Sequence, residues 1–192
     1  GVTAFAPGDH VVFSFVPVCG HCDPCASGRA ALCEPGAKAN VAGTLLGGTQ
    51  PFATGGGAAL NHHLGVSGFA ERTVVSQRSA VKIAPDLPYE IAALFGCAVM
   101  TGVGAVVNTA QLRAGQSIAI FGLGGVGLAA LLGAVAAGAY PVVAVDVNPA
   151  KLALAAELGA RHCIQAGNSG NVPAQIKAAV NGGVDIAIET VG

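Results

Sequence analysis

The chain has 192 residues, of which 53% are hydrophobic and 10% are charged, and its formal net charge is −1. Nine Lys and Arg residues against ten Asp and Glu residues leave no basic footprint, so we expect neither nucleic acid nor an anionic membrane as a partner. Nothing in the chain resembles a signal peptide, which favours a cytoplasmic protein of one large domain or two modest ones.

The N-terminal half is predicted to be rich in β-structure. A Pro7-Gly8-Asp9 turn precedes an apolar run, His10 to Phe15, that fits a strand, and further strands are expected at 69–76 and 80–83. Residues 35–68 are rich in Gly, Ala, Thr and Asn and predict a long irregular surface excursion. A helix is expected to begin near Tyr89, after two prolines.

Four cysteines in one short loop are the most informative feature of this half. Cys19, Cys22, Cys25 and Cys33 have the spacing C-x2-C-x2-C-x7-C. Sulfurs so close in sequence converge at little cost in loop-closure entropy. Four thiolates complete the tetrahedral shell of a structural zinc ion and leave no position for a substrate. Because the loop has few apolar residues, the metal would supply its order.

Other interpretations of this quartet are weaker. Paired disulfides suit small secreted scaffolds. Bacterial ferredoxins also open with C-x2-C-x2-C, but their fourth cysteine follows after three residues and precedes a proline, whereas Glu34 follows Cys33 here. A nucleic-acid-binding zinc module is disfavoured because Arg29 is the one Lys or Arg in the loop.

From Ser117 onward, strands and helices are expected to alternate. The predicted strands are 117–121, 141–146, 162–165 and 185–189, and the predicted helices are 125–137, 149–158 and 173–180. Asn148-Pro149 starts the second helix with an N-cap and a proline at the first position. This order implies a parallel, right-handed, doubly wound sheet. His162 and Cys163 are expected on an inner strand, in the core.

Two charge-free segments, 92–112 and 116–145, are long enough to span a membrane. Glycines and Pro141 divide the second segment into strand, turn, helix and strand. Elements buried on both faces of a parallel sheet are equally apolar, so we expect no membrane span.

The turn after the first of these strands has the pattern G-x-G-x-x-G. Its six residues are Gly122, Leu123, Gly124, Gly125, Val126 and Gly127. The motif follows a strand, opens a helix and precedes a strand that ends in Asp146, which is the context of a dinucleotide site. The helix N-terminus would receive the pyrophosphate. Asp146 would accept hydrogen bonds from the adenosine ribose and repel a 2′-phosphate, so NAD is preferred over NADP, and Lys151 could flank the same ribose.

With the cysteine loop and the glycine turn together, the chain resembles the zinc-dependent alcohol dehydrogenases of the medium-chain dehydrogenase/reductase superfamily. The resemblance covers essentially the whole chain. Within the superfamily, the chain is similar to the class I/III-like branch and to actinobacterial nicotinoprotein-type enzymes. It includes His62-His63-Leu64-Gly65, Thr73-Val74-Val75 and Gly96-Cys97. It implies an α/β chain with a partial GroES-like catalytic domain at 1–100, which carries the structural zinc lobe, and a partial Rossmann NAD-binding domain at 101–192.

The resemblance also implies a second, catalytic zinc ion and a reaction. The family holds that zinc with two Cys and one His, and the last of these ligands matches Cys97, which by itself would be interpreted as a buried core thiol. Thr101 matches a residue that contacts the nicotinamide. The implied reaction is hydride transfer between an alcohol, or an aldehyde or ketone, and NAD, and the intact enzyme is expected to be a homo-oligomer.

One departure from the family limits that expectation. Its other two catalytic-zinc ligands and its proton relay match no part of this chain, which we therefore interpret as an internal fragment, inactive by itself and prone to aggregate through an unpaired edge strand. His10, His21 and the His62-His63 pair are not expected to replace the ligands, although His63 and Leu64 could border the substrate pocket. The alternatives are a non-catalytic, zinc-stabilised NAD-binding module and a zinc-free quinone reductase, and the five matching cysteines disfavour the second.

Overall fold

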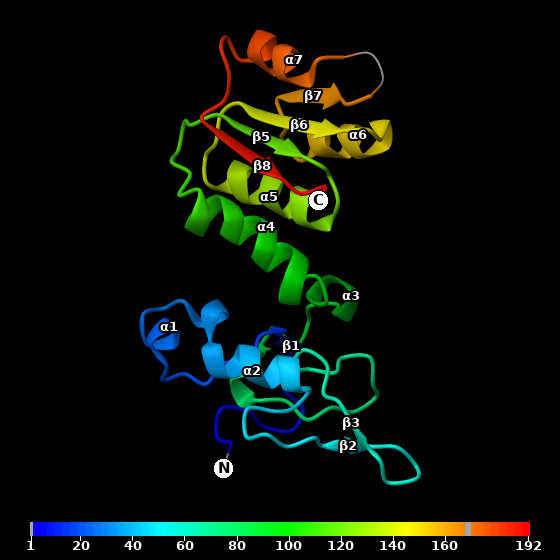
Figure 1. The fold of residues 1–192 in the computed structure, drawn as a ribbon. Coiled ribbons are helices and arrows are strands. Elements are labelled where there is room, and N and C mark those ends of the chain that lie inside the picture. Colours follow the sequence, from blue (N-terminus) through cyan, green and yellow to red (C-terminus); the bar gives the residue numbers. More distant parts are fainter. Residues whose placement is uncertain (1, 168–169) are drawn as a thin grey trace. The chain divides into compact units, whose positions relative to one another are not determined.

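The structure is a computed structural model that describes residues 2–167 and 170–192 (Figure 1). The chain forms two compact units, Gly1–Gly96 and Cys97–Gly192.

The first unit contains two small antiparallel sheets. β1 (Val11–Phe13) pairs with β4 (Ala80–Lys82), and β2 (Phe52–Ala53) pairs with β3 (Ala59–Leu60) in a hairpin. The expected strands at 10–15 and 80–83 are therefore present in shortened form. The expected strand at 69–76 is wrong: this stretch has no regular structure and leads into a 3₁₀ turn at Gln77–Ser79.

The cysteine loop forms short helical turns in place of strands. α1 (Asp23–Ala26) lies between Cys22 and the 3₁₀ turn Ala30–Leu32. α2 (Glu34–Ala42) follows directly and ends at Gly43, whose φ of 66° is left-handed. The prediction of an irregular excursion over 35–68 is therefore wrong at its start, where α2 forms, and in its middle, where the β2–β3 hairpin forms.

Helical structure extends from Tyr89 to Thr109, in agreement with the expected start at Tyr89. It comprises α3 (Tyr89–Ala92), α4 (Met100–Gly104) and two π-helical turns at Phe95–Val99 and Ala105–Thr109. By length and composition this stretch is apolar enough to cross a membrane, with a mean hydropathy of 1.9. Core helices of water-soluble proteins pass the same test, so this finding by itself identifies no membrane protein.

The second unit is a four-stranded parallel sheet with the order β7-β6-β5-β8. The strands are β5 (Ile118–Phe121), β6 (Val142–Asp146), β7 (His162–Gln165) and β8 (Ile186–Glu189). The helices between them are α5 (Gly125–Ala136), α6 (Pro149–Glu157) and α7 (Val172–Ala179). The chain thus moves outward from β5 to β7 and returns to the other side of β5, which confirms the predicted doubly wound sheet.

Alternation along β5 and β6 explains why helices cover both faces of this sheet. Ile118 and Ile120 pack with side chains of α5 and α6 on one face. Ala119, Val143 and Val145 pack with Ile176 of α7 on the other face. Successive side chains of a strand point to opposite faces, so β5 is apolar at every position and β6 is apolar up to its last residue, Asp146.

The expectation that His162 and Cys163 lie in the core is wrong. β7 is an edge strand of the sheet, Cys163 is exposed and His162 is half-buried. The sequence pattern shows a strand but not its place in the sheet, and an edge strand has one side without a strand neighbour.

Candidate functional site

The four cysteines of the loop converge as their spacing predicts. Their sulfur atoms all lie within 4.8 Å of one another, and among the described residues no other group of three or more Cys, His, Asp or Glu side chains converges in this way. The Sγ–Sγ distances are 4.0 Å for Cys19–Cys25, 3.4 Å for Cys22–Cys25 and 4.0 Å for Cys22–Cys33. All four cysteines are free thiols.

Backbone amides surround this sulfur cluster. The Cys33 thiol accepts hydrogen bonds from the amides of Cys19 and Gly36, at 3.3 and 3.4 Å, and it caps α2. Cys33 is almost fully buried, and a side chain on Gly36 would overlap the Pro17 carbonyl oxygen. The start of α2 and the fourth sulfur are therefore fixed by the same packing.

The thiols differ in how easily they ionise. Hydrogen bonding from the backbone of His21, with a further bond from the Cys22 amide, lowers the pKa of Cys19 to about 6, although burial acts against it. Burial, together with its cysteine neighbours, raises the pKa of Cys25 to about 12. A cation shared by the four sulfurs would favour the thiolate form of every member.

The sulfur spacing fits a tetrahedral metal ion. With zinc–sulfur bonds of about 2.3 Å, tetrahedral ligands lie about 3.8 Å apart, which falls within the range of distances found here. The donor set consists of four sulfurs, is complete in itself and is closed to a substrate. The quartet therefore fits a structural zinc ion.

The glycine turn joins β5 to α5 in the second unit. Gly122 has a left-handed φ of 85°, and its amide donates to the Val145 carbonyl at 2.8 Å. Gly124 occupies the N-cap position of α5, and because glycine has no side chain it makes no capping hydrogen bond to the helix. The first amides of a helix have no acceptor within the helix, so the N-terminus of α5 offers donors to an anion.

Asp146 holds this turn from the neighbouring strand. One carboxylate oxygen accepts from the Leu123 amide at 2.6 Å and the other accepts from the Asn148 amide at 2.8 Å. The side chain of Asp146 also faces Lys151 Nζ at 3.9 Å. Burial acts to raise its pKa, but the hydrogen bonds from Asn148 and Leu123 and the charge of Lys151 outweigh it, so the pKa lies below its usual value. Asp146 is therefore an anion poised to accept further hydrogen bonds.

A cavity of about 360 Å³ opens at this edge of the sheet. Gly122, Leu123, Gly124, Asp146 and Lys151 contribute to its lining, together with residues at the ends of β5 and β6 and residues just after β7 and β8. The carboxyl ends of parallel strands, at the point where the strand order reverses, form the usual ligand crevice of such sheets. The Leu123 side chain is buried in the core, and its amide donates to Asp146. Leu123 therefore affects the cavity through the conformation of the turn.

Thr190 and Val191, which follow β8, are among the lining residues that sequence reasoning missed. The Thr190 hydroxyl donates to the carbonyls of Phe121 and Gly122, at 2.9 Å each. No local signal could have identified this contact, because the partners are almost 70 residues apart in the chain.

Cys97 and Thr101 belong to the same unit as the glycine turn, and both are exposed. Exposure removes the interpretation of Cys97 as a buried core thiol. A side chain on Gly125 would lie 3.4 Å from the Cβ of Ala98, the neighbour of Cys97, so the segment that carries Cys97 contacts the start of α5. Among the described residues, no two further ligands join Cys97 in a metal site.

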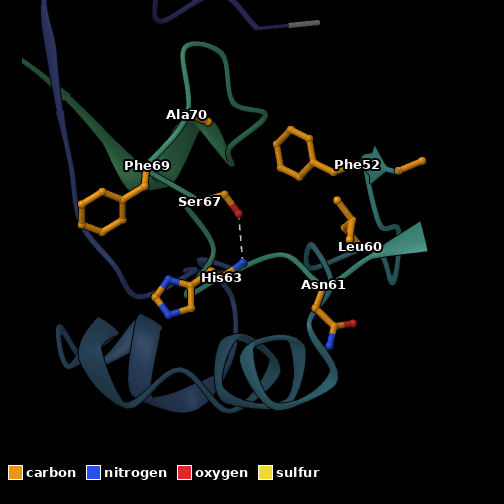
Figure 2. Close-up of a pocket in the computed structure, with 9 residues that line it drawn as sticks. Phe52, Leu60, Asn61, His63, Ser67, Phe69 and Ala70 are labelled. Atoms are coloured by element: carbon orange, nitrogen blue, oxygen red, sulfur yellow. Dashed lines mark hydrogen bonds between the residues drawn. The ribbon is translucent and has the colours of Figure 1, made fainter. Parts of the chain in front are cut away.

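His62 and His63, in the first unit, have different surroundings. His62 is buried, its Nε2 contacts the Val74 carbonyl at 2.8 Å, and its ring stacks on Phe52. His63 lines a cavity of about 440 Å³ with Phe52, Leu60 and Phe69 (Figure 2). The His63 amide donates to the Ser67 hydroxyl at 2.9 Å, as the dashed line in Figure 2 shows. His63 thus borders a pocket, whereas Leu64 does not line it.

Comparisons with known proteins found matches in both units. The model of the alcohol dehydrogenase GroES-like domain matches residues 1–86, and the model of the zinc-binding dehydrogenase matches residues 125–192. The chain belongs to the zinc-dependent alcohol dehydrogenases of the medium-chain dehydrogenase/reductase superfamily. The first matched range contains the cysteine quartet, and the second begins at Gly125, where α5 starts.

Individual relatives resemble the chain over its full length. An S-(hydroxymethyl)glutathione dehydrogenase of Synechocystis is 42% identical over 193 residues, and the match covers 100% of this chain and 52% of the relative. A solved alcohol dehydrogenase zinc-binding domain protein from Burkholderia ambifaria is 38% identical with a TM-score of 0.91, and a benzyl alcohol dehydrogenase from Acinetobacter calcoaceticus is 35% identical with a TM-score of 0.85. Both structures are matched over 100% of this chain and 51% of theirs. The chain therefore spans about half the length of the relatives it matches.

Proposed function

We propose that this chain is the zinc-lobe and dinucleotide-binding part of an NAD-dependent alcohol dehydrogenase that transfers hydride between an alcohol and NAD. The single observation that carries the proposal is the glycine turn, in which the Leu123 amide donates to the Asp146 carboxylate. The turn lines the cavity at the point where the strand order of the sheet reverses. The domain division at residue 100 and the roles of the site residues given below are parts of the same proposal.

The quartet Cys19, Cys22, Cys25 and Cys33 would hold a structural zinc ion. When bound, that ion supplies no chemistry to the reaction, because its four positions are filled by sulfur. The residues around it fix the loop: the amides of Cys19 and Gly36 donate to the Cys33 sulfur and set the start of α2.

The second unit would bind the cofactor. The amides at the start of α5, from Gly125 and Val126, would donate to the pyrophosphate, and Gly124 leaves room for its approach. Asp146 would accept from the adenosine ribose hydroxyls, and Lys151 would lie beside them. A 2′-phosphate placed against the Asp146 carboxylate would be repelled, so NAD is preferred over NADP.

Cys97 would contribute one ligand to a catalytic zinc ion, which when bound polarises the alcohol oxygen as a Lewis acid. Thr101, one helical turn further along, would face the nicotinamide. Exposure of both side chains and the contact of Ala98 with the α5 N-terminus support these roles.

The substrate class is a small alcohol or the corresponding aldehyde. S-(hydroxymethyl)glutathione and benzyl alcohol are the first substrates to test, because relatives at 42% and 35% identity are named for them. We further propose a cytoplasmic homo-oligomer without nucleic-acid or membrane partners, which the near-neutral net charge supports.

The test is cofactor selectivity in the wild type and in an Asp146→Asn variant, measured by isothermal titration with NADH and NADPH. The wild type is expected to bind NADH at least about tenfold more tightly, and the variant is expected to lose most of that preference. Asp185→Asn is the matched control, because Asp185 bonds Ser117 before the start of β5 and does not line the cavity. Equal affinity of the wild type for both cofactors would overturn the assignment of Asp146.

A second candidate function is a zinc-stabilised NAD-binding module without catalysis. It is favoured by the finding that, among the described residues, the quartet is the one group able to hold a metal ion by itself. Zinc content separates the two: about two zinc ions per chain support an enzyme with a catalytic site, whereas about one supports the module. Alcohol-dependent reduction of NAD would exclude the module.

A further inference from the structure

Thr190 follows directly after β8, the strand that pairs with β5 beside the glycine turn. β8 lies beside β5 in the sheet (Figure 1). The two strands pair in parallel, with Ile118 opposite Ile186 and Phe121 opposite Glu189. The next residue, Thr190, continues this pairing, because its amide donates to the Phe121 carbonyl at 2.9 Å. Its side chain is half-buried and lies in the lining of the cavity at the carboxyl ends of the strands.

The Thr190 hydroxyl binds the turn itself. Its one proton is shared between the carbonyl oxygens of Phe121 and Gly122, each 2.9 Å from Oγ1. Gly122 is the residue at which the chain leaves β5 with a left-handed φ of 85°. The hydroxyl therefore fixes the direction of the peptide bonds on both sides of that change of direction.

The glycines of the motif are packed around this threonine. A Cβ on Gly122 would lie 3.1 Å from Thr190 Oγ1 and 2.8 Å from Val191 Cγ2. A Cβ on Gly127 would lie 2.9 Å from the same hydroxyl oxygen and would overlap the Gly122 carbonyl oxygen. Two of the three motif glycines thus leave space for the side chain of Thr190 as well as for the turn.

Four backbone polar groups of the turn are bonded to protein partners. The Gly122 amide donates to Val145, the Leu123 amide donates to Asp146, and the carbonyls of Phe121 and Gly122 accept from Thr190. Asp146 and Thr190 hold the turn from opposite neighbouring strands, β6 and β8. The N-terminus of α5 has no side-chain cap, so its first amides are open to a ligand.

We propose that Thr190 is a positioning residue for the pyrophosphate of the dinucleotide. It acts through the carbonyls of Phe121 and Gly122 and so sets the direction in which the α5 amides meet the phosphates. The inference rests on the proposed NAD-binding function and adds to it a residue outside the G-x-G-x-x-G motif. A positioning role of this kind should affect ligands with a pyrophosphate and spare those without one.

The experiment compares three ligands, NADH, ADP and adenosine, by titration of the purified protein. In Thr190→Val, which removes the hydroxyl and keeps the branched shape, the dissociation constants for NADH and ADP are expected to rise about tenfold. Adenosine, which meets Asp146 but has no phosphate, is expected to change less than about twofold. Thr190→Ser restores the hydroxyl and should bring NADH binding to within about threefold of the wild type.

Controls separate positioning from general stability. Thr109→Val makes the same chemical change at an exposed site in the same unit and should leave all three affinities unchanged. If Thr190→Val does not fold, the pair Thr190→Ala and Thr190→Ser, which differ by one hydroxyl, gives the same comparison. Wild-type affinity for ADP in the variants that lack the hydroxyl would overturn the inference, and so would an equal loss for adenosine. Failure of the wild type to bind NADH would instead overturn the proposed function.

Discussion

Gly124 and Gly127 belong to one motif, but their replacement by alanine should have different effects. Gly124→Ala should weaken cofactor binding, whereas Gly127→Ala should lower the stability of the fold. A Cβ on Gly127 would overlap the carbonyl oxygen of Gly122 and lie 2.9 Å from the carbonyl carbon behind it. These are backbone atoms that cannot rotate away, so the turn itself must move. At Gly124, a Cβ has no neighbour within 4 Å, and its φ of −76° and ψ of −170° suit alanine.

The magnitudes follow from this geometry. Overpacking costs about 1–3 kcal/mol, and the upper end applies to Gly127→Ala because backbone must be displaced. In a domain of roughly 100 residues, about 3 kcal/mol corresponds to a fall of about 12–24 °C in Tm. Gly124→Ala should raise the free energy of unfolding by about 0.4–1 kcal/mol, because the unfolded chain loses freedom. Its methyl group, however, occupies the space where the pyrophosphate approaches, so NADH affinity should fall at least about tenfold.

The assay is thermal unfolding followed by circular dichroism, with NADH titration of each variant at a temperature where both are folded. The expected pattern is a stable Gly124→Ala protein that binds NADH poorly and an unstable Gly127→Ala protein. A Gly124→Ala variant with wild-type NADH affinity would refute the view that the phosphates meet the chain at this residue. A Gly127→Ala variant with an unchanged Tm would refute the packing argument.

Three further outcomes are expected. Cys33→Ser should lower the zinc content by about one ion per chain and expose the loop to proteolysis. Cys163→Ser, at an exposed thiol outside the quartet, should retain the metal, and equal zinc in both variants would contradict the assignment. The Ser117 hydroxyl and amide hold the pKa of Asp185 below its usual value, so its carboxylate stabilises the fold at neutral pH and this stabilisation is lost as pH falls through the lowered pKa. Urea midpoints of the wild type should therefore fall more steeply below about pH 4 than those of Asp185→Asn, and parallel curves would refute this reading. Gly102→Ala should destabilise the second unit by about 1–3 kcal/mol, because its Cβ would lie 2.6 Å from the Ala130 amide nitrogen of α5. Gly104→Ala, whose Cβ would make an ordinary 3.8 Å contact with Asn108 Nδ2, serves as the control in the same melting experiment.

The sequence predicted the second unit more completely than the first. The four strands of the parallel sheet were expected within one residue of their bounds, because apolar runs separated by Gly, Pro and Asn signals mark each end. The place of β7 at the edge was missed, because a strand's own residues do not show which neighbours it will have.

In the first unit, metal-ligand spacing was more informative than periodicity. The cysteine quartet was found from its spacing and converges in the structure. The expected strand at 69–76 failed although its residues favour β-structure, since a short apolar run cannot show whether a partner strand is present. α2 was missed although Pro35 and Gly43 mark its two ends, because its N-cap is the thiol of Cys33, outside the usual N-cap residues.

The candidate site shows the same division between local and distant information. The glycine turn and Asp146 were predicted because the motif and its spacing lie within one βαβ unit. Thr190 could not be predicted, because its contact with the turn depends on the parallel pairing of β5 with β8. Contacts between distant segments are set by the fold, and a single sequence carries no direct record of them.

The most direct measurement of the central claim is an isothermal titration of the zinc-loaded, purified protein with NADH. The account predicts saturable binding of one NADH per chain, with affinity for NADPH at least about tenfold weaker. Folded, zinc-containing protein that binds neither nucleotide, or that prefers NADPH, would contradict it.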